Sequence, residues 1–386
     1  MSRVKLLSVV LILGLVNACQ FRTEPQPSAN TPVNPPGAAT YAPASSDLVL
    51  TDTPTPFLPL PPTPTASPIP SPTITSTPSP TSLPVITLLF TGVIVPARCV
   101  QSAIDARGSP DYIYTEVCDL IQQADLAVGT LNASINDTSD HTGCIETYKL
   151  VGSSNNADAL ASAGFDVMSV ATNHIKNGGN PGFFSTLDNL RRVGIVPVGA
   201  GSNLEEALQP VVLSVKGVRF GIVSLGMIEP MAFAGADTPG IAVLTDENLL
   251  SAIVAARKVS DVVIAMPHWG PEDTPNPDRF QLRFAQALVE AGANLVVGNH
   301  THVVQAVQEI DGITVFYGLG NFVFDQTWDL AHQQGVILRV TFEGTQMVGY
   351  ELIPTHVDGN GTVHIAGPEE SAQVLDRIQQ ASDRLR

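Results

Sequence analysis

Four histidines follow apolar runs at positions where buried strands should end. The stretch "NLVVGNHTH" delivers His300 and His302 two residues apart, and "FDVMSVATNH" and "DVVIAMPHWG" carry His174 and His268. Alternate residues on an extended backbone point the same way, so we expect the imidazoles of His300 and His302 to converge. Together with the amide oxygen of Asn173, imidazoles suit zinc, manganese or iron. The pattern therefore predicts a shared site for a divalent transition metal.

Amphipathic stretches alternate with these apolar runs through most of the chain. For example, "DENLLSAIVAARKVS" precedes "DVVIAMPHWG", and "DRFQLRFAQALVEAG" precedes "ANLVVGNHTH". Near-continuous apolar runs between amphipathic helices indicate parallel strands that are covered on both faces, and ligands bind beyond the carboxyl ends of such strands. Later segments, such as "GVILRVTF" and "GTVHIAG", favour antiparallel strands. Two β layers with helices outside them would satisfy both halves.

The first residues predict export and a membrane anchor. Residues 1–18 combine a basic start with an apolar run too short to be a stable membrane span, which is typical of a signal peptide. The sequence "LVNAC" resembles the lipobox of bacterial lipoproteins, so we expect Cys19 to be lipidated and to hold the protein on the outer face of a membrane. The alternative is plain secretion after cleavage at Ala18.

A Pro-, Thr- and Ser-rich segment separates this signal from the folded part. Residues 19–84 contain few large apolar side chains and many prolines, so they predict a disordered, extended stalk. Residues 85–366 are long enough for one large α/β domain, and residues 367–386 predict a closing helix.

The net charge argues against one class of partner, and the cysteine spacing argues against a cysteine zinc site. The formal net charge is −17, which argues against binding of nucleic acid because such binding rewards basic surfaces. Cys99, Cys118 and Cys144 lack the close spacing of a zinc site. In an exported chain they could form one disulfide with one thiol left over, and the sequence leaves the pairing open.

Four motifs in the domain resemble one known family. "ATNHIKNGG", "HWGPED", "GNHTHVVQ" and "YGLGNFVFDQ" are similar, in order and spacing, to motifs of the CapA family of capsule or poly-γ-glutamate synthesis proteins. The resemblance implies a four-layer α/β/β/α sandwich of the metallo-dependent phosphatase type. It also implies a role in making, anchoring or exporting an extracellular polymer, with that polymer or the capsule synthesis machinery as partner.

The resemblance also implies roles for individual residues. Asn173 and His174 match the family's Asn-His pair, His268 and Glu272 its His-Trp-Gly motif and the following acid, and His300 and His302 its His-x-His. The implied metal ligands are Asn173, His174, His268, His300 and His302, and the implied catalytic groups are His174, His268 and Glu272. Trp269 is expected to form a wall of the substrate pocket, and Asn321, in the Leu-Gly-Asn-Phe turn, its floor.

Three carboxylates of the family pattern are absent. Val93 stands where the first strand usually ends in Asp, Asn132 where the second has Glu, and Asn177 where an Asp follows the Asn-His pair. A two-metal site needs a bridging carboxylate to offset the repulsion between the ions. We therefore expect at most one metal, held by His300, His302 and either His174 or His268.

Three functions fit these observations. The first is a lipid-anchored CapA-like metal-dependent hydrolase, in which His268 or His174 carries the proton if it is not a ligand. The second is a binding or scaffolding pseudoenzyme of the same fold, and the third is a cell-wall hydrolase. A serine hydrolase has no support, because no Gly-x-Ser-x-Gly motif is present.

The remaining polar candidates have local roles in this interpretation. Asp325 is expected to cap a turn, and four further histidines are expected at the surface, away from the strand ends: His141, His332, His356 and His364.

Overall fold

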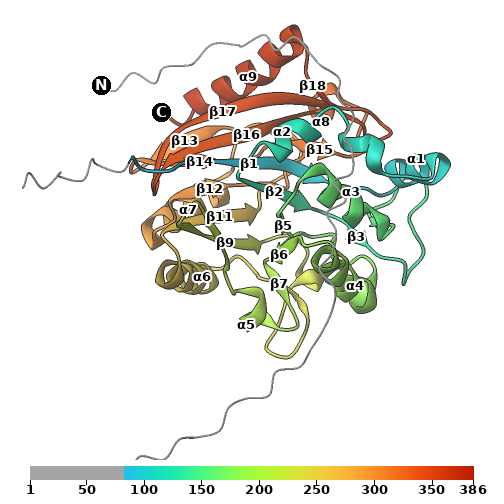
Figure 1. Ribbon diagram of the computed structural model, residues 1–386, viewed down its shortest axis with the longest axis horizontal. Helices are drawn as coiled ribbons and strands as arrows, with labels where there is room; N and C mark the ends of the chain where they lie inside the picture. The colour runs from blue at the N-terminus through green and yellow to red at the C-terminus, as the bar shows by residue number, and fades with distance from the viewer. Residues whose placement is uncertain (1–81) are drawn as a thin grey trace, which may run out of the picture. The chain divides into compact units, whose positions relative to one another are not determined.

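The computed structural model describes residues 82–386, which fold around two large β-sheets (Figure 1). The predicted export signal, Cys19 and nearly all of the predicted stalk lie outside the described residues. Within residues 82–386, no helix combines the length and the apolar composition that crossing a bilayer requires.

The larger sheet joins strands from both ends of the described chain. Its strand order is β18-β17-β16-β1-β2-β5-β6, and β15 pairs with β1. β1, β2, β5 and β6 run parallel, whereas β16, β17 and β18 are antiparallel. Its strands are β1 (Val85–Ile94), β2 (Leu126–Leu131), β5 (Val167–Ser169), β6 (Val196–Val198), β15 (Asn321–Val323), β16 (Gln334–Glu343), β17 (Gln346–Val357) and β18 (Val363–Ile365).

The second sheet has the order β13-β14-β12-β11-β9-β8. Its four central strands are parallel, and each edge strand forms an antiparallel pair with its neighbour. The strands are β8 (Val211–Val215), β9 (Val218–Gly226), β11 (Val262–His268), β12 (Leu295–Val297), β13 (Val307–Ile310) and β14 (Ile313–Phe316). Two short pairs complete the strands: β3 (Ser134–Ile135) with β4 (Val151–Gly152), and β7 (Ala200–Gly201) with β10 (Gly240–Ile241).

The helices begin and end at recognisable signals. In α7, Asp278 and Gln281 form a capping box, the apolar Phe284 and Leu288 are buried, and Gly292 ends the helix at a φ of 108°. The helices are α1 (Cys99–Arg107), η1 (Asp111–Tyr114), α2 (Cys118–Gln122), α3 (Asn155–Ala163), α4 (Gly179–Arg192), α5 (Leu204–Ala207), η2 (Pro230–Ala232), α6 (Asp246–Val259), α7 (Arg279–Ala291), α8 (Leu330–Gln333) and α9 (Pro368–Asp383).

The two sheets pack face to face. Phe90 and Val128 of the larger sheet share one buried cluster with Ile222 and Ile264 of the second sheet. The contact between the two sheets buries apolar side chains on the inner face of each sheet. Burial of apolar surface is the main stabilising contribution of such a core.

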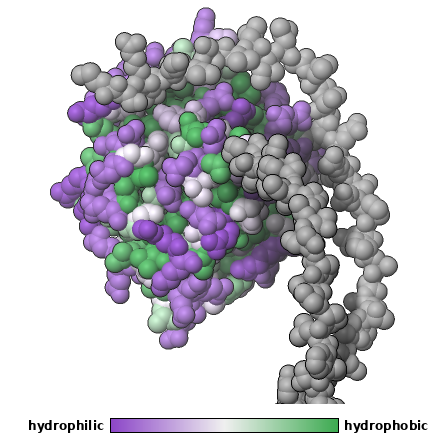
Figure 2. Space-filling model, turned by 60° about the vertical axis from the view of Figure 1, so that its left-hand side comes forward, coloured by the Kyte–Doolittle hydropathy of each residue, from purple (hydrophilic) through white to green (hydrophobic). Residues whose placement is uncertain are grey.

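Helices cover the outer face of each sheet. Leu89, the neighbour of the inward-facing Phe90, belongs to the same buried cluster as Phe183 and Leu187 of α4, whereas Val263 of β11 shares a second outer cluster with Leu288 of α7. The predicted four-layer α/β/β/α sandwich is therefore confirmed, including the antiparallel character of the later strands. On the face shown in Figure 2, hydrophilic and hydrophobic residues are interspersed.

A disulfide joins Cys99, at the start of α1, to Cys144 in the loop between β3 and β4. None of the cysteines in residues 82–386 is free, so the expectation of a leftover thiol is wrong.

Candidate metal centre

Three predicted ligands meet beyond the carboxyl ends of β5, β11 and β12. β11 ends at His268, which still pairs with Gly226 of β9. The loops after β5 and β12 bring Asn173 and His300 to this side chain. Nε2 of His268 lies 3.0 Å from Oδ1 of Asn173 and 3.2 Å from Nδ1 of His300. Strand ends of both sheets thus assemble the group, because β5 belongs to the larger sheet and β11 and β12 belong to the second.

The backbone at His300 and His302 is left-handed and not extended. β12 ends at Val297, and the two histidines have φ values of 103° and 60°. The expectation that an extended strand points both rings the same way is therefore wrong. Positive φ costs a residue with a β-carbon about 1–3 kcal/mol, and such strain concentrates at functional sites. A tight turn, and not strand alternation, places the ring centroids 5.9 Å apart.

Glu272 approaches the same two histidines from the loop after β11. Its Oε1 lies 3.7 Å from Nε2 of His300 and 3.8 Å from Nε2 of His302. Within residues 82–386, these three side chains form the one group of His, Cys, Asp and Glu whose ligand atoms all lie within 4.8 Å of one another. Two ligands about 2.1 Å from one ion stand about 3.0–3.4 Å apart, so the two distances to Glu272 are a few tenths of an ångström longer than such a site has.

His300 belongs to both groups but cannot serve both at once. It faces His268 with Nδ1 and Glu272 with Nε2. A neutral imidazole has one lone pair and one N–H, so it ligates through one nitrogen and donates through the other. The two groups therefore describe alternative positions at which His300 could hold an ion.

The tautomer of His302 follows from its neighbour Asn321. Nδ2 of Asn321 lies 2.9 Å from the carbonyl oxygen of His332, which can only accept, so this atom is the amide nitrogen. Oδ1 of Asn321 then accepts the Nδ1 proton of His302 at 2.8 Å. The lone pair of His302 consequently lies on Nε2, the nitrogen that faces Glu272. An outer partner of this kind is usual for a metal-binding histidine.

The same reasoning applies to His174. Oδ1 of Asn177 accepts the N–H of Leu150 at 2.7 Å, which identifies it as oxygen, and it lies 2.9 Å from Nδ1 of His174. His174 therefore carries its proton on Nδ1 and has its lone pair on Nε2. Asn132, at the end of β2, accepts the main-chain N–H of His174 at 3.2 Å. Asn132 and Asn177, which replace family carboxylates, thus position His174 without adding charge.

Burial keeps the imidazoles neutral. Loss of solvation, strengthened by neighbouring imidazoles, lowers the pKa of His300 to about 3, and burial lowers the pKa of His302 to about 4. Burial also lowers the pKa of His268 and His174. A histidine must be neutral to bind a metal, so none of them needs to lose a proton near pH 7. Burial and the adjacent Asp273 charge raise the pKa of Glu272.

An apolar cluster occupies the corner from which a carboxylate is missing. Val93 and Phe324 are buried there together with Val95, Ala97, Ala133 and Leu150. The Phe324 ring centroid lies 5.3 Å from that of His302. The chain crosses very closely here, since a β-carbon on Gly92 would meet the carbonyl oxygen of Gly320 at 2.1 Å. Val93 thus places apolar side chains, which cannot ligate a metal, on this side of the centre.

Two expected pocket residues occupy different places. Trp269 has no exposed surface, and its Nε1 donates to the carbonyl of Tyr317 at 2.9 Å, so it lies in the core and not on a cleft wall. Asn321 is also buried, at 1% exposure, and supports His302. It does not form a pocket floor.

Two other residues have larger roles than the sequence suggests. His332 is 3% exposed, so the prediction of a surface position is wrong, and its Nε2 lies 2.7 Å from Oδ1 of Asp273. Asp325 caps a distant helix and not its own turn, because it accepts the N–H of Cys99 at 2.9 Å and pairs with Arg98. The other three histidines, His141, His356 and His364, lie in separate contacts with carboxylates.

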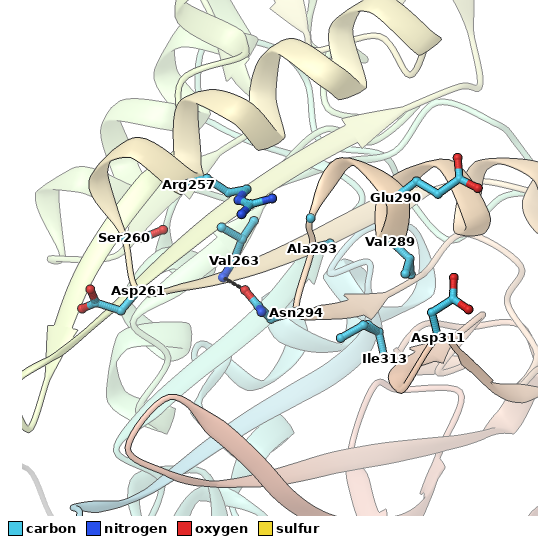
Figure 3. Close-up of a pocket in the computed structure, with 11 residues that line it drawn as sticks. Arg257, Ser260, Asp261, Val263, Val289, Glu290, Ala293, Asn294, Asp311 and Ile313 are labelled. Atoms are coloured by element: carbon cyan, nitrogen blue, oxygen red, sulfur yellow. Dashed lines mark hydrogen bonds between the residues drawn. The ribbon is translucent and has the colours of Figure 1, made fainter.

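A hollow at the other end of the strands of the second sheet contains none of the expected site residues. It lies at the start of β11, where Val263 contacts Asn294, whereas His268 ends that strand (Figure 3). Its rim carries Arg257, Glu290 and Asp311. This hollow is therefore separate from the candidate metal centre.

Comparison with known sequences gives a consistent set of relatives. Residues 87–326, more than half of the chain, match the family described as bacterial capsule synthesis protein PGA_cap. Over 255 residues the chain is 28% identical to the PGA biosynthesis protein CapA of Bacillus subtilis (strain 168). The aligned region covers 66% of this chain and 67% of that protein. Over 252 residues it is 30% identical to the capsule biosynthesis protein CapA of Bacillus anthracis, and the aligned region covers 63% of this chain and 61% of that protein. The chain thus spans about two thirds of these curated relatives or slightly less.

Solved structures are more distant. A phosphatase from Mycoplasma pneumoniae is 15% identical, with a TM-score of 0.44, over 77% of this chain and 99% of that chain. The NAD nucleotidase of Haemophilus influenzae is 12% identical, with a TM-score of 0.45, over 77% and 63%. Similarity at this level carries no conclusion about activity.

Proposed function

This chain belongs to the family of bacterial capsule synthesis proteins, and on that premise we propose that it takes part in making a capsule or poly-γ-glutamate-like polymer outside the cell. The proposal includes one divalent transition metal, zinc, manganese or iron, at the candidate metal centre. The observation that carries it is the convergence of Glu272, His300 and His302 in a member of this family.

Glu272, His300 and His302 are the ligands that we propose for this ion. This set alone includes a carboxylate, whose negative charge offsets part of the charge of a dication at a buried position. Its two histidines also have outer partners on their other nitrogens: His268 for His300 and Asn321 for His302. The contact with Asn321 favours the tautomer of His302 in which Nε2 is free to ligate.

His174 is the proton carrier in this proposal. A bound divalent ion would supply Lewis acidity toward a phosphoester, amide or similar bond and would lower the pKa of water. Because Asn177 accepts the Nδ1 proton of His174, this residue accepts and returns a proton at Nε2. The lowered pKa of His174 keeps it in the basic, neutral form at pH 7.

Metal analysis of the purified protein tests the centre. We expect one equivalent of metal in the wild type and in His141→Ala, a control that removes an exposed histidine elsewhere, and none in His300→Ala. Glu272→Ala and Asn173→Ala separate the two positions: loss in the first only supports the proposed ligand set, and loss in the second only supports the set of Asn173, His268 and His300. A metal-free protein whose thermal stability is unchanged by EDTA or added metal would reject both.

A second candidate function is a binding or scaffolding protein without turnover. The apolar cluster around Val93 favours it, because this cluster removes ligands from one side of the centre. Poly-γ-glutamate and purified wall fragments should be incubated with the metal-loaded protein, and soluble products measured. Turnover that is lost in His174→Ala while the metal is retained supports a hydrolase. Polymer retention without products supports the binding function, and release from wall fragments alone supports a cell-wall hydrolase.

We also propose that the protein is anchored on the outer face of the membrane through lipidated Cys19, as the lipobox-like sequence suggests. Labelled fatty acid should be incorporated into the full chain and not into Cys19→Ala. An unlabelled protein found in the culture medium would instead support secretion.

A further inference from the structure

His332 lies beside the candidate metal centre, although nothing in its local sequence indicates this. It belongs to the short helix α8, which follows β15 and its residue Asn321. Its imidazole is buried and directs Nε2 toward Asp273, with 2.7 Å between Nε2 and Oδ1. Because a carboxylate oxygen accepts, Nε2 of His332 donates in this contact.

Asp273 is the next residue after Glu272, and it is held at two points. Its main-chain N–H donates to the carbonyl of Thr301 at 3.1 Å, between the two metal-binding histidines in the chain. Its φ is 64°, a left-handed conformation that persists only where surrounding contacts hold it. The contact with His332 is the second point. The loop that carries Glu272 is therefore fixed by one main-chain and one side-chain hydrogen bond.

The main chain of His332 reaches the centre by a second route. Its carbonyl oxygen accepts from Nδ2 of Asn321 at 2.9 Å, and Oδ1 of Asn321 accepts from His302 at 2.8 Å. His332 thus contacts Asp273, which adjoins Glu272, with its side chain, and Asn321, which supports His302, with its carbonyl oxygen.

We propose that His332 is a positioning residue that holds Glu272 against His300 and His302 through Asp273. As far as it concerns a metal ion, this inference rests on the proposed function. Stability alone is a poor reason for this contact, because Asp273 is 62% exposed and solvent screens its interactions. The ring of Trp328 also lies near the imidazole of His332, with 5.3 Å between ring centroids.

Metal affinity of the full protein, measured by titration calorimetry with zinc or manganese, is the first test. His332→Ala should weaken binding about 10- to 100-fold, the usual effect of losing an outer-shell contact. His332→Gln, whose amide N–H can replace the lost donor, should return the dissociation constant to within a few-fold of wild type. His356→Ala is the matched control, since it removes another histidine–carboxylate contact, 2.8 Å to Glu370, away from the centre.

Amide hydrogen exchange of residues 270–274 in the metal-free protein is the second test. We expect faster exchange in His332→Ala, because the hydrogen bond from Asp273 to Thr301 loses its lateral support, and wild-type exchange in His332→Gln and His356→Ala. Unchanged exchange in His332→Ala overturns the inference, even if the wild type binds no metal and the proposed centre fails. In a protein that does bind metal, an unchanged affinity of His332→Ala or no rescue by His332→Gln also overturns it.

Discussion

His302, in the loop after β12, and Asn321, the first residue of β15, form a hydrogen bond with 2.8 Å between Nδ1 and Oδ1. This bond fixes which nitrogen of His302 is available to a metal. Asn321→Ala should therefore weaken metal binding about 10- to 100-fold, as measured by calorimetry. Asn321→Asp keeps the oxygen that accepts from His302 but donates to the carbonyl of His332 only when it is protonated, so it should retain more affinity than Asn321→Ala. Equal loss in both variants would contradict this role for the acceptor oxygen.

Val93→Asp should destabilise the metal-free protein. Its carboxylate would enter a cluster of buried apolar side chains, where an uncompensated polar or charged group costs several kcal/mol, roughly 2–4 as a point substitution. Urea unfolding measures this loss, and saturating manganese or zinc should recover part of it if the new group reaches the ion. Val93→Asn, similar in size but neutral, shows how much of the recovery needs the charge. A Val93→Asp protein as stable as the wild type would show that this corner is not dry.

The metal-free protein should lose stability as the pH falls from about 6.5 toward 4. The folded-state pKa values of His300, about 3, and His302, about 4, lie below the ordinary value of 6.5. The unfolded chain therefore takes up protons first, and the free energy of unfolding falls by about 1.4 kcal/mol per pH unit for each such histidine.

Urea unfolding at a series of pH values checks this slope. His300→Gln should flatten it between pH 6.5 and 5, a window above the titration of most carboxylates. The same slope in wild type and variant would contradict the neutral, buried state of His300.

The pair of Arg98 and Asp325 should be important for stability. The two side chains are 12% and 4% exposed, and removal of one partner leaves a buried charge without compensation. Asp325→Asn should lower the free energy of unfolding by about 3–5 kcal/mol in urea or thermal unfolding. Asp188→Asn, in an exposed pair with Arg191, is the control and should have little effect. A small effect of both substitutions would mean that water reaches Arg98.

The sequence predicted the layers and the strand ends because both follow from local patterns. Apolar runs and amphipathic periodicity are properties of neighbouring residues, so the parallel and antiparallel halves could be inferred before any contact was known. For the same reason, the sequence correctly predicts that His268, His300 and Asn173 lie close together at the ends of strands.

Contacts between segments distant in the sequence decided the arrangement of side chains within the site. The positive φ of His300 and His302 comes from a turn that strand alternation does not predict, and His332 contacts Asp273, which lies 59 residues earlier in the chain. Trp269 is adjacent to a site residue but points into the core. The sequence by itself determined which donor types are available and which carboxylates are missing. Only the tertiary structure decided which donors face one another, because that depends on how loops from separate strands pack.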